Sequence, residues 1–164
     1  MVTEMPTTLA YRIVPIAAAF LQSVRQFDLD DQNQAVEHLI ANGGEPCRDA
    51  LRRATAGEEL LLASYSPFAI AGPYKEFGPV FIYANQNAVP RDDLGLSDLI
   101  EQQYLGAQFV LRAYSAQERI VDARLTSPDR CEADLQSLLR LEEVNFVLVR
   151  FAAYGCYACR IERR

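Results

Sequence analysis

The sequence predicts an α+β fold, in which a few short helices pack on one face of an antiparallel or mixed β-sheet. Helical and strand-like apolar patterns are interspersed through all 164 residues, and no internal repeat or Ser/Gly-rich linker divides the chain. The links between the later strands are short, and short links join antiparallel neighbours. We therefore expect a single domain over residues 1–164, whose N-terminal part, 1–45, has the weakest patterns.

That N-terminal part contains three apolar segments. Residues 10–16 predict a strand and residues 16–25 a short helix. Residues 35–41 fit either element, and Gly43 and Gly44 then end the pattern.

A short helix is predicted from Pro46 to about Gly57. Proline suits the first position of a helix, where its missing N–H has no helical partner to lose. Apolar residues then recur at the spacing of one helical face: Cys47, Ala50, Leu51 and Ala54.

Two strands and two loops follow. Residues 58–65 and 79–84 are apolar runs of strand length. Residues 66–79 between them carry three prolines and two glycines, which neither a helix nor a strand tolerates in its interior. This segment is therefore predicted to be a structured loop, and residues 85–93 a second loop.

The remaining elements are predicted by clearer patterns. Ser97 can cap a short helix that runs to Tyr104, and residues 108–114 and 119–125 form a hairpin. A helix from Ser127 to Leu141 places four residues on one apolar stripe: Cys131, Leu135, Leu138 and Leu139. Residues 144–151 are apolar on both faces, which is typical of a central strand, and residues 157–162 can pair back with them.

Composition excludes several classes of protein. Half of the residues are apolar and 23% are charged, which excludes wholesale disorder, and no apolar run approaches the length of a membrane span. The net charge of −6 repels phosphate backbones unless one face is locally basic, so nucleic acid is not an expected partner. No membrane partner is expected either. Lys75 is the only lysine, which leaves a single amine for Schiff-base chemistry.

The protein is expected to be cytoplasmic, with reduced cysteines. Residues 13–21 come nearest to a signal peptide, but Pro15 interrupts this short apolar run, and Glu4 and Arg12 cancel in the segment before it. The four cysteines could pair in a secreted protein, but a chain of this size and apolar content does not need disulfides.

Thiol, metal and histidine chemistry have weak support in the sequence. Cys156 and Cys159 form a C-x-x-C spacing, used in thiol exchange and in zinc sites, but no second pair exists and a strand would point the two side chains to opposite faces. A zinc site would also need Cys47 and His38, so we expect no metal and no cofactor. His38, the only histidine, has no nucleophile motif around it and is expected on the surface or at its boundary.

The candidate site is the segment 65–84, which gathers aromatic residues, prolines and glycines around Lys75 and Glu76. Such a loop is either a ligand surface or a rigid plug for a sheet edge. Three arginines lie in mostly apolar strands: Arg112, Arg150 and Arg160. Each must end a strand near water, pair with a carboxylate such as Glu76, or line a site for an anionic ligand.

Five separated motifs resemble those of an uncharacterised bacterial family, domain-of-unknown-function family 1203. They are PCRDALRRATAGEELLLASYSPF, PYKEFGPVF, LRAY followed by IVDA, VRFAAYGCY, and the terminal RIER, which together span Pro46 to Arg163. The family has no established activity, so the resemblance supports a single domain without implying a reaction. This chain departs from the family pattern at Tyr83 and residues 85–87, where a histidine and often a cysteine are usual, and at Ala50, where a second cysteine is usual.

We therefore expect a small binding or interaction domain, in which the 67–79 loop and the strand arginines accept a polar or anionic small molecule. The candidate ligand-binding residues are Tyr74, Glu76, Arg112, Tyr114, Arg150 and Tyr154. The alternative is an enzyme with Glu76 as acid or base and with Tyr74 and Cys156 nearby, and a third reading is thiol-redox or metal binding through Cys156 and Cys159. A homodimer through an exposed strand at 157–162 is a further expectation.

Overall fold

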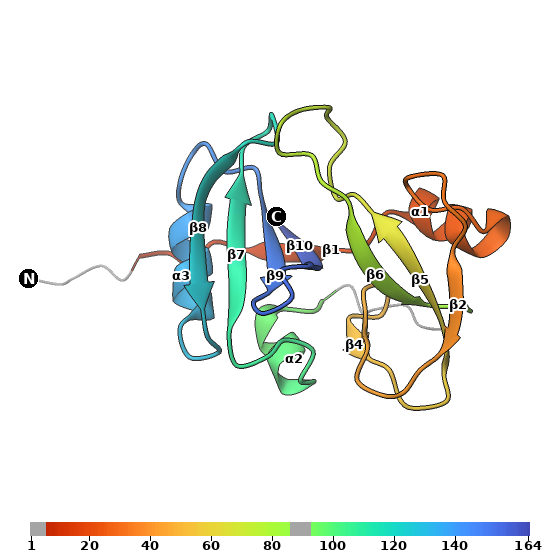
Figure 1. Cartoon of the computed structure of the whole chain (residues 1–164). Helices are drawn as coiled ribbons and strands as arrows, with labels where there is room; N and C mark the ends of the chain where they lie inside the picture. The colour runs from red at the N-terminus through yellow and green to blue at the C-terminus, as the bar shows by residue number, and fades with distance from the viewer. Residues whose placement is uncertain (1–5, 86–92) are drawn as a thin grey trace, which may run out of the picture.

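The computed structural model describes residues 6–85 and 93–164 (Figure 1). Their strands form two five-stranded sheets accompanied by short helices, so the predicted α+β class is confirmed. The division of the strands between two sheets was not predicted. It depends on which distant strands pair, and the pattern of a single strand carries no information about its partner.

The first sheet is antiparallel throughout and has the order β1-β10-β9-β7-β8. Its strands are β1 (Tyr11–Val14), β7 (Phe109–Tyr114), β8 (Ile120–Thr126), β9 (Phe146–Phe151) and β10 (Tyr157–Arg163). All six residues of β9 are buried, as predicted for a central strand. Because β10 pairs with β1 on one side and β9 on the other, the edge expected to support a homodimer is occupied.

The second sheet is mixed and has the order β2-β5-β6-β3-β4. Its strands are β2 (Glu37–Ile40), β3 (Pro46–Cys47), β4 (Arg52–Arg53), β5 (Glu59–Tyr65) and β6 (Gly78–Tyr83). The pairing of β3 with β6 is parallel, and the others are antiparallel. Helix α1 (Ala18–Gln22), which continues into the π-helical turn η1 (Ser23–Phe27), packs its buried Phe20 and Val24 with this sheet.

The predicted helix from Pro46 to about Gly57 is wrong. These residues instead form β3, a tight turn and β4. The backbone N–H of Leu51 donates to the carbonyl of Cys47, but Leu51 itself has a φ of 54°, which ends any helical turn. Pairing of Cys47 with Phe81 of β6 satisfies the backbone across the sheet, so this long-range contact overrides the helical spacing.

Two further helices lie beside the first sheet. Helix α3 (Cys131–Leu139) buries the four residues of its predicted stripe against that sheet. Helix α2 (Leu96–Glu101) begins after Gly95 rather than at Ser97, because the Asp98 carboxylate accepts the Gly95 N–H at 2.8 Å. The second predicted loop, 85–93, falls mostly on residues 86–92, which lie outside the described residues.

Side-chain alternation along β9 sets the layers of the molecule. Val147 and Val149 belong to the apolar core that the first sheet shares with α2 and α3. Phe146 and Leu148 point to the opposite face and share a second core with Leu61 and Ile82 of the second sheet. The same alternation places Arg150 on the face toward the second sheet, where the candidate site lies. Among the described residues, no helix is long and apolar enough to cross a membrane.

Candidate functional site

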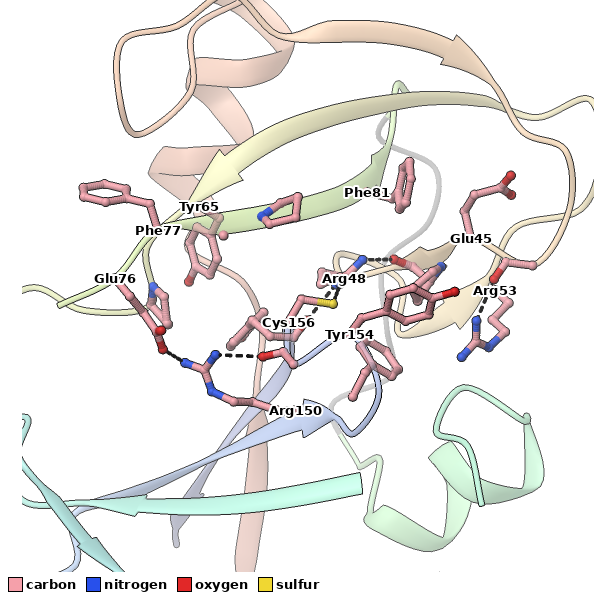
Figure 2. A pocket seen from close by; sticks show the side chains of 18 residues that line it. Glu45, Arg48, Arg53, Tyr65, Glu76, Phe77, Phe81, Arg150, Tyr154 and Cys156 are labelled. Atoms are coloured by element: carbon pink, nitrogen blue, oxygen red, sulfur yellow. Dashed lines mark hydrogen bonds and ion pairs between the residues drawn. The ribbon is translucent and has the colours of Figure 1, made fainter. Parts of the chain in front are cut away.

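A cavity of about 680 Å³ lies where the two sheets meet. Its lining comes from residues 44–53 of the second sheet, from residues 65–81 of β5, β6 and the loop between them, and from residues 150–157 of the first sheet. We call it the junction cavity. Three arginines and two glutamates line it together with several aromatic rings, and Figure 2 shows these side chains at close range.

One end of the junction cavity is closed by a charged cluster around Glu76. The Arg150 guanidinium, 7% exposed, donates from Nη2 to the Glu76 carboxylate and from Nη1 to the Gly155 carbonyl at 3.1 Å (Figure 2). Arg112 adds a second cation, with its Nη1 at 3.6 Å from Glu76 Oε1. Two of the three arginines singled out in the sequence therefore pair with Glu76, one of the alternatives stated for them. Arg160 pairs instead with Glu162 at 2.9 Å.

The base of the junction cavity is formed by Arg48, a buried residue that the sequence analysis did not select. Its side chain crosses from the second sheet to the first, where Nε donates to the carbonyl of Tyr157 at 2.8 Å. Nη1 donates to the carbonyl of Pro46 at 2.7 Å. Nη2 donates to the sulfur of Cys156 at 3.1 Å (Figure 2). With a relative exposure of 2%, Arg48 is a cation held almost entirely away from water.

Arg53 places a second cation close to the first. It donates to the carbonyls of Gly44, Gln103 and Tyr104 at 2.7 to 3.0 Å. Both guanidinium groups lie near the Phe151 ring, with their carbons 5.2 Å and 5.6 Å from its centroid for Arg48 and Arg53 respectively. No carboxylate among the described residues forms an ion pair with either arginine. Arg48 and Arg53 are thus two lining cations without an ion-pair partner in the described chain, and Glu45 is the other charged residue on this side of the lining.

The loop over the cavity is held by the hairpin of β7 and β8. In Figure 1 the loop between β5 and β6 arches from the second sheet toward this hairpin. The Glu118 carboxylate accepts the N–H groups of Ala69 and Ile70 at 2.9 and 3.0 Å, and the Arg119 guanidinium lies over the Tyr74 ring. The loop predicted from the prolines and glycines is therefore ordered by contacts from a distant part of the chain.

The structure places the predicted site residues in three different settings. Glu76, Arg150, Tyr154 and Cys156 line the junction cavity, and Tyr154 is 90% exposed there. Arg112 reaches the Glu76 cluster from outside the lining. Tyr74 does not line the cavity, and Tyr114 is fully buried, stacked on Phe146 in the core between the sheets. The three residues of the enzyme alternative, Glu76, Tyr74 and Cys156, are thus not gathered in one cavity.

The four cysteines are free: Cys131 and Cys159 belong to the first-sheet core, Cys156 packs against that core, and Cys47 belongs to a core cluster on the second sheet. Cys47, Cys131 and Cys159 are buried, and burial raises the pKa of the Cys47 thiol to about 12 and the pKa of Cys131 and Cys159 above the ordinary value. His38 pairs with Asp28 at 2.5 Å on the surface. Among residues 6–85 and 93–164, no group of three potential ligands could hold a metal ion.

Two of the described positions at which the chain departs from the family pattern, Ala50 and Tyr83, come together in space. Ala50 and Tyr83 belong to one small core cluster with Cys47, on the second sheet. The Tyr83 hydroxyl donates to the Glu58 carboxylate at 3.0 Å, and the Arg52 guanidinium lies 4.5 Å from the Tyr83 ring centroid. Burial raises the pKa of Tyr83, so its hydroxyl stays protonated and acts as a hydrogen-bond donor to Glu58.

Arg48 and Arg53 were missed because the segment was interpreted as a helix. On a helix the two would be surface residues beside an apolar stripe, whereas the β3 turn points Arg48 into the junction between the sheets. The available signal was the cluster of Arg48, Arg52 and Arg53 in a chain of net charge −6. Composition alone does not say which of them is buried.

Comparisons with known proteins give one match. A family model described as protein of unknown function (DUF1203) matches residues 44–163. No curated protein and no solved structure matches the chain. The matched residues include every segment that lines the junction cavity.

Proposed function

The chain belongs to the DUF1203 family, whose description names no activity, and from the site itself we propose that the junction cavity binds a small organic anion. The observation that carries this proposal is the pair Arg48 and Arg53, two neighbouring cations without a carboxylate partner in the described chain, at the base of a cavity of about 680 Å³. Guanidinium groups of this kind recognise carboxylates and phosphates.

The walls of the cavity favour a ligand with an apolar body. Tyr65, Phe77, Phe81 and Phe151 contribute aromatic surface around the arginines. A cleft or cavity of several hundred cubic ångströms with apolar walls and a few polar groups is typical of small-molecule binding. A carboxylate attached to an aromatic or alkyl group therefore matches the chemistry of the site.

Glu76 contributes selectivity at the other end of the cavity. Its carboxylate compensates Arg150 and Arg112, so these two arginines are less available to an anion than Arg48 and Arg53. The ligand's charge is therefore expected at the Phe151 end of the cavity, and its apolar part along Tyr65 and Phe77. This arrangement supports binding rather than acid–base chemistry, since Glu76 is held in a cluster of cations.

The test compares phenylacetate with its neutral isostere phenylacetamide. At a phenylacetate concentration ten times the Kd, the native state should gain about 1.4 kcal/mol, which raises the thermal midpoint by about 3–5 °C. Phenylacetamide should give little or no shift at the same concentration. No shift with phenylacetate up to tens of millimolar, or equal shifts with both compounds, would count against the proposal.

A pair of variants locates the binding charge. Arg53→Gln removes one of the two cations and should weaken phenylacetate binding about tenfold. Arg163→Gln is the matched control, because Arg163 also donates to the carbonyls of Leu139, Leu141 and Val144 but lies outside the cavity lining. The control should lose stability without losing affinity.

A further inference from the structure

The junction cavity presents one thiol, that of Cys156. Among the four cysteines it alone is not fully buried, and it alone lines the cavity. Its sulfur accepts a hydrogen bond from Arg48 Nη2 at 3.1 Å, and Figure 2 shows the two groups side by side at the centre of the site. We propose that Cys156 exchanges with small anionic disulfides that enter this cavity. This inference rests on the proposed function in one respect: both require that small anions can enter the cavity.

Arg48 places a buried cation beside the Cys156 sulfur. Buried arginines are ordinarily paired with an anion, yet Arg48 pairs with none of the described carboxylates and is 2% exposed. Its other acceptors are neutral backbone carbonyls. The species that attacks in disulfide exchange is the thiolate, and Arg48 Nη2, at 3.1 Å from the sulfur, is positioned to donate a hydrogen bond to it during the reaction.

The other thiols are protected from the same reaction. Cys47, Cys131 and Cys159 are buried in the apolar cores, which excludes a disulfide reagent from their sulfurs. Burial also raises the pKa of each of these three thiols, so they remain protonated near neutral pH. Exchange on the native protein should therefore be confined to one residue.

The charge of the lining favours an anionic reagent. Three arginines line the cavity against two glutamates, although the whole chain carries −6. Glu76 is compensated by Arg150 and Arg112, and Glu45 accepts the N–H groups of Asn42 and Gly43 in its own loop. A disulfide with carboxylates can therefore place a negative group beside Arg53 while its sulfurs reach Cys156.

The exchange balances without any further reactant. Cys156 loses its thiol proton to solvent, and its sulfur attacks one sulfur of the small disulfide. The disulfide's S–S bond breaks, a new S–S bond forms to Cys156, and the other half leaves as a thiolate. The Cys156 sulfur thus passes from the thiol to the disulfide oxidation level, the leaving sulfur of the reagent passes from the disulfide to the thiol level, and excess small thiol reverses the step.

Two aromatic disulfides that differ in charge test the inference. 5,5′-Dithiobis(2-nitrobenzoate) carries a carboxylate on each ring, whereas 4,4′-dithiodipyridine is neutral. Native protein should take up one thionitrobenzoate per chain, located at Cys156 by peptide mass spectrometry and absent from Cys156→Ser. For each thiol we compare the rate of reaction with the anionic reagent to the rate with the neutral reagent. This ratio should be about tenfold higher for Cys156 than for the free thiol 2-mercaptoethanol at low salt, and it should fall as salt is added.

Variants of the arginines distinguish attraction of the anionic reagent from an effect on folding. Arg48→Lys keeps a cation but loses the fixed contact with the sulfur, and should slow both reagents several-fold. Because Arg48 is buried and this variant could fail to fold, Arg53→Gln provides a second measurement, in which only the anionic reagent should slow. Arg163→Gln should leave both rates unchanged. Labelling at another cysteine, no labelling of the native protein, or a rate ratio equal to that of 2-mercaptoethanol would overturn the inference.

The outcome is distinguishable from that of the proposed function. Phenylacetate binding can be measured on Cys156→Ser, where no thiol faces the cavity. Binding by that variant, together with no adduct on the parent protein, would overturn the thiol inference alone. An adduct at Cys156 with the expected rate ratio, together with no phenylacetate binding, would overturn the proposed function alone.

Discussion

Arg48 and Tyr157 connect the two sheets through one buried hydrogen bond, from the guanidinium Nε to the backbone carbonyl at 2.8 Å. Arg48 lies in the turn after β3 of the second sheet, and Tyr157 begins β10 of the first. The two sheets also share an apolar core that includes Leu61, Val80, Phe146 and Leu148. On this basis we propose that they fold as one domain, as the sequence analysis expected.

The first prediction concerns the stability of this junction. The protein should unfold in urea in a single transition, and Arg48→Met should lower the free energy of unfolding by about 3 kcal/mol, because it leaves two carbonyls without their donor. Arg119→Met is the control: Arg119 is exposed, and its loss should cost less than about 0.5 kcal/mol. Equal effects of the two substitutions would show that Arg48 does not hold the sheets together.

The second prediction concerns Glu76. Glu76→Gln removes the one carboxylate of the described chain that pairs with Arg150, whose side chain is 7% exposed. Glu76 itself is 42% exposed, so water screens part of the loss, and we expect a cost of about 1–2 kcal/mol by urea unfolding. Asp122→Asn breaks the comparable but exposed pair with Arg124 and should cost between about 0 and 1 kcal/mol. A smaller cost for Glu76→Gln than for the control would contradict the structure of the cluster.

How far the sequence predicts this site depends on the range of the contacts. The stripe of α3 and the buried β9 follow from local apolar spacing, and the pairing of Arg150 with Glu76 follows from the need of a strand arginine for a partner. The turn after β3 does not follow from local apolar spacing, because it exists only when Cys47 pairs with Phe81 of β6. Since Arg48 is carried by that turn, one of the three arginines that line the cavity could not be predicted as a buried site residue without the long-range pairing.

The third prediction concerns the loop between β5 and β6. Glu118→Ala removes the acceptor of the Ala69 and Ile70 N–H groups, so these amides should exchange with solvent roughly tenfold faster or more. Hydrogen exchange followed by NMR gives the rates residue by residue. Asp122→Ala is the control on the same hairpin, because its carboxylate pairs with Arg124 and not with the loop. Unchanged protection of Ala69 and Ile70 would mean that the hairpin does not order the loop.

The fourth prediction is a pH dependence at Glu58. The hydrogen bonds from Arg52 and from the Thr55 N–H lower the pKa of Glu58 below its ordinary value of 4.5. Because the folded pKa is the lower one, the stabilisation is present above pH 4.5 and is lost as the pH falls through the folded value. Glu58→Gln should therefore cost about 0.5–1 kcal/mol at pH 7, and the difference from the parent should shrink steadily below pH 4.5.

Glu59→Gln is the control for this pH series. Glu59 is the next residue along the chain and is exposed at the start of β5. Its substitution should change the free energy of unfolding little at any pH. A Glu58→Gln effect that stays constant down to pH 3 would show that the carboxylate's ionisation is not what stabilises this corner of the second sheet.

The last prediction concerns metal content. In the described chain no group of three potential ligands could hold a metal ion: Cys47 lies in the second-sheet core, Cys159 lies in the first-sheet core, and Cys156 lines the junction cavity and packs against the first-sheet core. Tetrahedral zinc needs four ligands at one point, within about 2.0–2.3 Å of the metal. His38 is bonded to Asp28 at the surface and does not line the cavity. Untagged protein should therefore contain much less than one zinc per chain by elemental analysis, and a chelator should leave its thermal midpoint unchanged. One tightly held zinc per chain, or unfolding on chelation, would require these side chains to converge in a way that the two-sheet arrangement does not allow.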